Sequence, residues 1–83
     1  MSKILGSRIR QQRARLDLTQ AQLAALIGIS ATSMNAIEAG ETDPRASRIL
    51  KLAEVLDVTT DYLFGRDDRE RRERPLTLAL AGT

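Results

Sequence analysis

The 83-residue sequence contains neither cysteine nor histidine. Without cysteine the chain has no disulfide framework and no thiolate metal site, and without histidine it lacks the commonest metal ligand and general base. No apolar run approaches the length of a membrane span, and the first residues lack the apolar stretch of a signal peptide. We therefore expect a cytoplasmic protein that is not an enzyme, holds no metal or other cofactor, and does not bind a membrane.

Aromatic residues are also scarce, because Tyr62 and Phe64 are the only two. This excludes a base-stacking platform for single-stranded nucleic acid and an aromatic cage. What the sequence does contain is 42% apolar residues in a short chain. That composition is enough for one small domain with a modest core and a single function.

Charge is unevenly distributed, although the formal net charge is only +2. Residues 1–17 contain five basic side chains and one acidic side chain, whereas residues 18–65 contain three basic and six acidic ones. A basic first helix on a mildly acidic body is typical of a surface that meets phosphate. The alternative is a basic face that is simply solvated.

The stretch from Thr19 to Gly40 predicts two short helices joined by a tight turn. Thr19 and Gln22 have the spacing of a capping box, which predicts a helix over about residues 20–27. Gly28 follows where a helix commonly ends in the left-handed conformation, and Ser30 can cap a second helix. Such a short joint forces the helices to cross, which is the geometry of the helix-turn-helix that places its second helix in the major groove of DNA.

The second helix, about residues 30–39, has an outer face of small side chains. Met34 and Ile37 return to the inner side, and Ala24 fits the point where the two helices approach most closely. By itself this pattern is equally consistent with a plain helical hairpin inside a bundle. The residues expected to point outward are Ala31, Thr32, Ser33, Asn35 and Ala36.

A first helix is predicted over about residues 3–16, because Leu5, Ile9 and Leu16 keep one helical face. The sequence assigns its other polar side chains to other faces: Arg8, Arg10, Gln12 and Arg15.

Two charged residues occupy positions that should be buried. Arg13 lies four residues after Ile9, and Glu38 lies four residues after Met34. An inward cation and an inward anion are each costly unless they meet. We infer an ion pair between Arg13 and Glu38, the alternative being that both side chains reach out to water.

Two further helices complete an all-α, five-helix fold. One is expected from Arg45 or Ala46 to Leu56, ending at Asp57, and a short one is expected before Gly65. The apolar stripe of the longer helix should cover the helix-turn-helix: Ile49, Leu50, Leu52, Ala53 and Leu56.

The composition changes after Gly65, which divides the chain into a domain at 1–65 and an extension at 66–83. The charged segment 66–75 is a solvated helix or a linker, with Asp68 and Arg72 at helical spacing. Leu76, Leu78 and Leu80 alternate as in a strand. Such a lone strand is either frayed or pairs with its copy in a second subunit, which makes these leucines candidates for dimerisation.

Together these features resemble the phage repressor (lambda repressor/Cro-like, XRE) family of helix-turn-helix DNA-binding domains, over about Leu5 to Gly65. The resemblance rests on T-Q-x-x-L-A, I-G-I-S, I-E-x-G, a later D-P, and L-A-x-x-L-x-V-x-x-D-Y-L, in that order.

The resemblance implies which residues meet DNA. The outward residues of the second helix would face base edges, with Asn35 on adenine and the Thr32 methyl group against thymine. Gln20 would contact a phosphate and support the second helix, and the resemblance also pairs Arg13 with Glu38. Because Glu41 and Asp43 would repel phosphate, other residues must hold the backbone. We expect these to be Thr19, Gln20, Arg10, Arg45 and Arg48.

The resemblance therefore implies a transcriptional regulator, a repressor, that binds a two-fold symmetric site on double-stranded DNA as a homodimer. The alternative is a protein-interaction module, such as an antitoxin or an adaptor, in which the C-terminal tail binds a protein partner and DNA binding is secondary.

Overall fold

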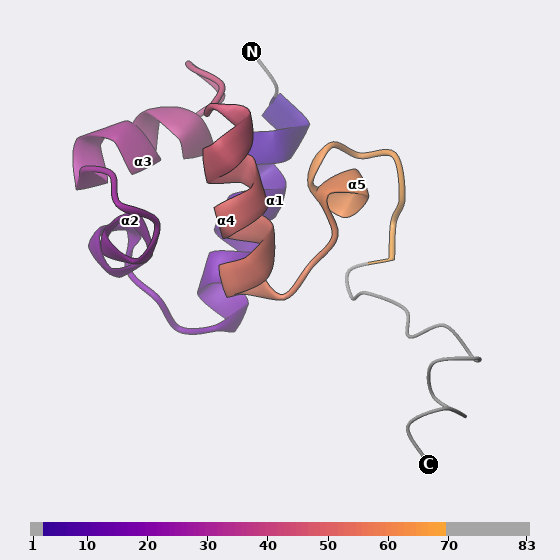
Figure 1. The fold of residues 1–83 in the computed structure, drawn as a ribbon, viewed down its shortest axis with the longest axis horizontal. Coiled ribbons are helices and arrows are strands. Elements are labelled where there is room, and N and C mark those ends of the chain that lie inside the picture. The colour runs from indigo at the N-terminus through magenta and orange to yellow at the C-terminus, as the bar shows by residue number, and fades with distance from the viewer. Residues whose placement is uncertain (1–2, 70–83) are drawn as a thin grey trace.

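The computed structural model of the chain describes residues 3–69, and within them the structure is entirely helical (Figure 1). The predicted all-α architecture is confirmed, with every helix close to its expected bounds. In chain order the helices are α1 (Lys3–Arg15), α2 (Gln20–Ile27), α3 (Ala31–Glu38), α4 (Ala46–Leu56) and α5 (Thr60–Leu63).

The helix boundaries follow from the capping residues that the sequence contains. The Thr19 hydroxyl accepts from the Gln22 N–H at 3.0 Å, and the Thr19 N–H donates to Gln22 Oε1 at 2.9 Å, so the capping box is complete. Gly28 ends α2 with φ 80°, and Ser30 caps α3 through the Ser33 N–H at 3.1 Å. Asp57 ends α4 in the left-handed conformation with φ 56°, as expected.

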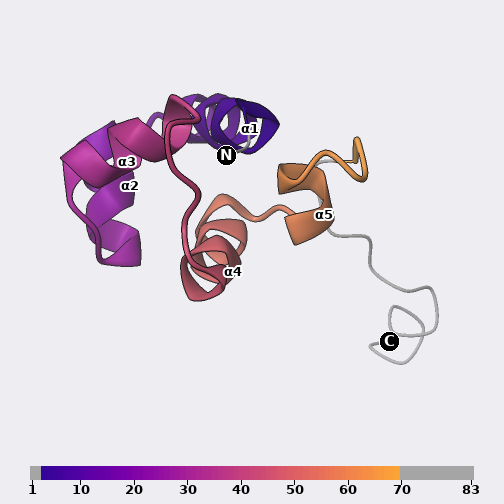
Figure 2. The ribbon, with the colours of Figure 1, turned by 90° about the horizontal axis from the view of Figure 1, so that it is seen from above.

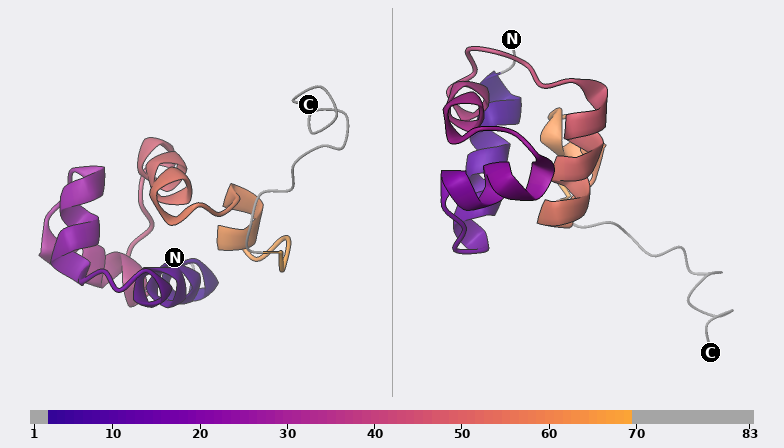
Figure 3. Two further views of the ribbon diagram at one scale, coloured as in Figure 1. Left: turned by 90° about the horizontal axis from the view of Figure 1, so that it is seen from below. Right: turned by 60° about the vertical axis from the view of Figure 1, so that its left-hand side comes forward.

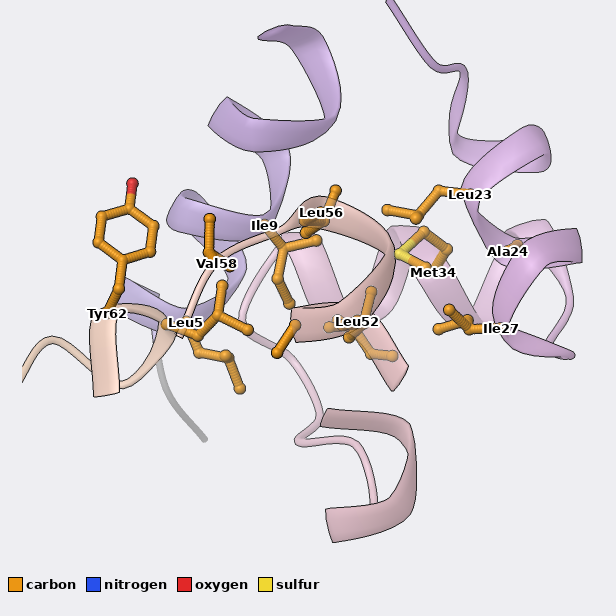
Figure 4. Close-up of a cluster of buried hydrophobic side chains, with 13 residues drawn as sticks. Leu5, Ile9, Leu23, Ala24, Ile27, Met34, Leu52, Leu56, Val58 and Tyr62 are labelled. Carbon is orange, nitrogen blue, oxygen red and sulfur yellow. The ribbon is translucent and has the colours of Figure 1, made fainter. Parts of the chain in front are cut away.

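A single hydrophobic core lies along α4 (Figure 4). Leu52 and Leu56 project from α4 into the centre of the close-up, between the helix-turn-helix on one side and α1 with α5 on the other. Met34 of α3 lies near Leu23 of α2, which joins the two helices of the motif. Packing in this core fixes the position of α3 and determines which side of the helix faces solvent.

Two leucines assigned to apolar faces are exposed instead. Leu50 is 61% exposed, because the buried stripe of α4 passes through Ile49, Leu52 and Leu56 and leaves Leu50 on the solvent side. Leu16 is 37% exposed, because α1 ends one residue earlier and the chain turns away through Asp17, whose φ is 57°.

Gln12 is also placed differently from its prediction. It is only 2% exposed, and its Nε2 donates to the Tyr62 hydroxyl at 3.1 Å while its Oε1 accepts from Arg15 Nε at 2.6 Å. A buried amide is tolerated here because both of its polar ends have partners. Helical periodicity alone could not anticipate that the only tyrosine would supply one of them.

Gly6 marks the closest approach of α1 to the end of α3. A Cβ at this position would clash with the carbonyl oxygen of Ile37 and would lie 2.6 Å from that of Glu38. Only a residue without a side chain lets the two backbones come so close.

The start of the charged extension folds back on α1. Arg8 donates to the Tyr62 and Asp67 carbonyl oxygens at 2.6 and 2.9 Å and to Asp68 Oδ1 at 2.8 Å. Its guanidinium carbon also lies 4.4 Å from the centroid of the Tyr62 ring. Arg8 therefore packs against α5 rather than pointing to solvent, and the end of the described chain lies beside α5 in the left view of Figure 3.

Within the extension, hydrogen bonds from Arg69 hold the pKa of the Asp67 carboxyl below its usual value. Residues 70–83 lie outside the described part of the chain. This range includes Arg72 and the predicted dimerisation leucines, Leu76, Leu78 and Leu80.

Candidate nucleic-acid interface

The candidate interface is built on α2 and α3, which are joined by only three residues, 28–30. In Figure 1 α2 is seen end-on while α3 runs across the view, and Figure 2 shows both helices at one end of the molecule. The short joint therefore makes the helices cross, as the sequence predicts. This arrangement leaves one long side of α3 uncovered.

The uncovered side of α3 carries the side chains that were expected to point outward. Met34, Ile37 and Glu38 are buried on the inner side. The outer side is small and uncharged, which suits close approach to the floor of the major groove. Ala31, Thr32, Ser33 and Asn35 are exposed, and Ala36 is half-buried.

A network of polar side chains holds α3 from behind. Arg13 donates from Nε to Glu38 Oε2 at 2.8 Å and from Nη2 to Glu38 Oε1 at 3.1 Å, which confirms the predicted ion pair. Gln20 Nε2 lies 3.2 Å from Glu38 Oε1 and 3.3 Å from Asn35 Oδ1. The position of an exposed α3 side chain, Asn35, is thus tied to a buried ion pair through Gln20.

A groove of about 350 Å³ runs along α3 beside the loop that leads to α4. Thr32, Ser33 and Ala36 form one wall, and Asp43 and Arg45 belong to the loop side. Arg45 thus brings a cation to the groove beside the outer side of α3, while Asp43 brings an anion to the same groove.

Arg48, which was expected to contact a phosphate, also forms hydrogen bonds within the protein. Its Nη1 donates to the carbonyl oxygens of Ile27 and Gly28 at 2.6 and 3.1 Å. These carbonyls lie at the C-terminal end of α2, where a cation is favoured by the helix dipole. Arg48 therefore joins α4 to the turn of the motif.

The basic residues of α1 are mostly engaged within the protein. Arg8 binds α5 and the extension, Arg13 binds Glu38, and Arg15 donates to the Leu56 carbonyl oxygen at 3.1 Å. Lys3 donates to the Ala39 carbonyl oxygen at 3.3 Å. Arg10 is exposed and makes no hydrogen bond or ion pair within residues 3–69, so it is the arginine of α1 best suited to a phosphate.

The beginning of α2 offers further donors. Thr19 is exposed, Gln20 is half-buried, and the first-turn amides of a helix have no intrahelical partner. Such amides form a ready anion site. Because both hydrogens of Gln20 Nε2 point at protein acceptors, its main-chain N–H is the donor available to a phosphate.

Within residues 3–69 no group of three or more acidic side chains is arranged to hold a metal ion. None of the helices in this part of the chain is long and apolar enough to cross a membrane.

Comparison with known proteins agrees with this geometry. The sequence profile of a family described as helix-turn-helix matches residues 9–63. Repressor protein C2 of Salmonella phage P22 is 33% identical over 66 residues, which cover 80% of this chain and 31% of that protein. The CTXphi transcriptional repressor RstR of Vibrio cholerae is 42% identical over 62 residues, which cover 75% of this chain and 55% of RstR. The chain therefore spans about a third to a half of the length of these relatives.

Solved structures show the same fold. A crystal structure of the P22 c2 repressor in complex with a synthetic operator has a TM-score of 0.74 and 33% identity, and the match covers 80% of this chain and all of that one. The restriction-modification controller protein C.AhdI from Aeromonas hydrophila has a TM-score of 0.69 and 34% identity, covering 75% of this chain and 94% of that one.

The family profile, the relatives and the crossed α2–α3 pair lead to one assignment. The chain belongs to the phage repressor (lambda repressor/Cro-like, XRE) family of helix-turn-helix proteins.

Proposed function

We propose that this protein is a sequence-specific, double-stranded-DNA-binding transcriptional repressor that inserts α3 into the major groove. The observation that carries the proposal is the exposed, uncharged outer side of α3, held from behind by Gln20 and the buried Arg13–Glu38 pair. A rigidly supported helix with small outward side chains fits closely against base edges.

Base recognition falls to the outward residues of α3. Thr32 offers a methyl group to thymine, and Asn35 offers an amide to a neighbouring base. Because the helix has no arginine, lysine or glutamine on this side, sequence-dependent DNA shape contributes a considerable share of the selectivity. The proposed base-facing residues are Ala31, Thr32, Ser33, Asn35 and Ala36.

Phosphate contacts lie around this helix. Thr19 and the main-chain N–H of Gln20 meet one phosphate at the start of α2. Arg10 and Arg45 are exposed cations, and Arg45 lines the groove beside α3. Arg48 contributes through the nitrogen atoms that do not hold α2.

The protein binds as a homodimer to a two-fold symmetric operator, with half-sites about 10 base pairs apart. One domain of this size covers too little DNA to be selective, and a second copy doubles the contact. The P22 c2 repressor, whose fold is similar, was crystallised with a synthetic operator, which supports DNA as the partner.

Selection of bound duplexes from random-sequence DNA tests the proposal. The full chain should enrich a palindromic sequence, and a Thr32→Ala, Asn35→Ala variant should lose preference at the contacted base pairs by roughly 1 to 3 kcal/mol each. Gln11→Ala, on an exposed position of α1, is the control and should select the parental sequence. If the double variant bound the same sequence with the same selectivity, α3 would not be the reading helix.

A second candidate function is supported by the one acidic residue of the groove, which Arg45 and Arg48 also line. Asp43 lies there beside α3, and an anion disfavours phosphate in that place. A protein-interaction module, an antitoxin or an adaptor, would bind its partner through the tail and use DNA only secondarily; the related SinR is seen in a complex with SinI. Truncation after Arg69 distinguishes the two, because a module would lose its protein partner and keep DNA binding, whereas a repressor would lose dimerisation and bind its operator weakly.

A further inference from the structure

We propose that the buried ion pair fixes the orientation of the Asn35 amide, so that Asn35 reads a keto oxygen on the DNA, guanine O6 or thymine O4, instead of adenine. The inference rests on the proposed insertion of α3 into the major groove, and it names the base chemistry that this site accepts.

The chain of hydrogen bonds begins at Glu38. Its side chain is 2% exposed, and Arg13 donates to both of its oxygens. A carboxylate in such a pair accepts hydrogen bonds and has none to give. Any neighbour that bonds to it must therefore present a donor.

Gln20 is the neighbour that must do so. Its side chain can bond to Glu38 Oε1 only through Nε2, which lies 3.2 Å away. The other end of the amide, Oε1, would face the carboxylate oxygen as a second acceptor and would be repelled. The Gln20 amide is thus oriented by the charge of Glu38, and its second N–H is directed at the side chain of Asn35.

Asn35 receives this second N–H on its own oxygen. Gln20 Nε2 lies 3.3 Å from Asn35 Oδ1, so the Asn35 amide must turn Oδ1 inward. Its Nδ2 makes no hydrogen bond within residues 3–69 and belongs to an exposed side chain on the outer side of α3. The group that Asn35 offers to DNA is therefore a donor with two hydrogens.

This orientation changes the base that Asn35 recognises. The adenine contact expected from the sequence needs Oδ1 to accept from N6 while Nδ2 donates to N7. With Oδ1 held by Gln20, the amide meets the base through Nδ2 alone. Guanine O6 and thymine O4 accept such a donor. Adenine presents only N7 as an acceptor, next to an N6 amino group that repels a second donor, and cytosine N4 is itself a donor, so both bases are disfavoured. Gln20 and Glu38 act as positioning residues for this selectivity.

The test uses the full chain and random-sequence duplex DNA. Selection with the parent and with Asn35→Ala first identifies the base pair whose preference depends on Asn35. Four duplexes that differ only at that pair are then titrated with each protein. The parent should bind guanine and thymine on the contacted strand about tenfold more tightly than adenine and cytosine, a ratio within the range expected for one base contact.

Gln20→Met tests the orienting step, because methionine keeps the shape of the side chain and removes both donors. The variant should gain adenine binding at this pair relative to guanine and thymine, while Gln11→Met, the same change at an exposed position, should behave as the parent. If Gln20→Met does not fold, as judged by thermal unfolding, the four-duplex comparison on the parent decides alone.

A strict preference of the parent for adenine, unchanged in Gln20→Met, would overturn the inference and leave the proposed function intact. Failure of the parent to enrich any sequence would overturn both.

Discussion

Arg13 and Glu38 meet through two hydrogen bonds, of 2.8 and 3.1 Å, that join the end of α1 to the end of α3. The arginine side chain is 17% exposed and the glutamate 2%, so the anion is the more deeply buried partner. Arg13 also donates to the Leu18 carbonyl oxygen at 2.7 Å, which fixes the loop before α2. One side chain therefore connects α1, the loop before α2, and α3.

Removing the cation should be costly for stability. Arg13→Ala leaves Glu38 buried with only Gln20 as a side-chain donor, and we expect a loss of roughly 3 to 5 kcal/mol in the free energy of unfolding. Urea denaturation followed by circular dichroism measures it. Arg10→Ala, an exposed arginine on the same helix, is the matched control and should change the free energy by less than about 0.5 kcal/mol. Equal behaviour of the two variants would show that the pair contributes nothing to the fold.

The contact at Gly6 predicts a second stability effect. In Gly6→Ala the added methyl group meets the carbonyl oxygens of Ile37 and Glu38, and backbone atoms cannot move away as a flexible side chain can. We expect a loss of about 1 to 3 kcal/mol, because the strain exceeds the gain in helix propensity that alanine brings. Ser7→Ala, the neighbouring position, is the control. A Gly6→Ala protein as stable as the parent would show that α1 and α3 can separate there without cost.

The helices and the helix-turn-helix are predictable from the sequence because contacts between nearby residues determine them. Thr19 and Gln22 define the start of α2, and Gly28 defines its end, through contacts between residues close in sequence. The pairing of Arg13 with Glu38 was also accessible, because two opposite charges on buried faces have few ways to be satisfied.

The side chains whose burial differs from the sequence-based prediction are those that pack against segments distant in the sequence. Gln12 is buried because Tyr62, fifty residues away, supplies an acceptor for it. Arg8 likewise finds its partners in α5 and the extension. Periodicity places a residue on a face of its helix, but it does not say how wide the covered face is, and Leu50 is exposed for this reason.

The different engagement of the α1 arginines predicts how salt affects DNA binding. Arg10 has no partner within the described residues, whereas Arg15 is bonded to Gln12 and to the end of α4. Arg10→Ala should therefore weaken binding to all sequences and reduce the slope of log K against log salt by about 1. Arg15→Ala should leave the slope unchanged and lower the stability. Titrations of the selected operator between low and moderate salt measure the slope for each variant. If only Arg15→Ala reduced the slope, Arg15 and not Arg10 would be the residue that contacts a phosphate.

The last prediction concerns the three leucines of the tail. If Leu76, Leu78 and Leu80 form the apolar face of a strand that pairs with its copy, changing all three to serine removes the surface that dimerises. In such a strand the residues between and after them would lie on the opposite face. Changing Thr77, Ala79 and Ala81 to serine is therefore a matched control with the same number of substitutions.

Sedimentation at micromolar concentration should give a dimer for the parent and for the control variant, and a monomer for the leucine variant. The leucine variant should also bind a two-half-site operator more weakly than the parent while binding a single half-site equally well, because linking two sites raises the effective concentration of the second. A parent that sediments as a monomer would exclude the tail as a dimer contact. If both variants remained dimeric, the dimer contact would lie in the helical domain, where Ile4 and Phe64 are exposed apolar side chains.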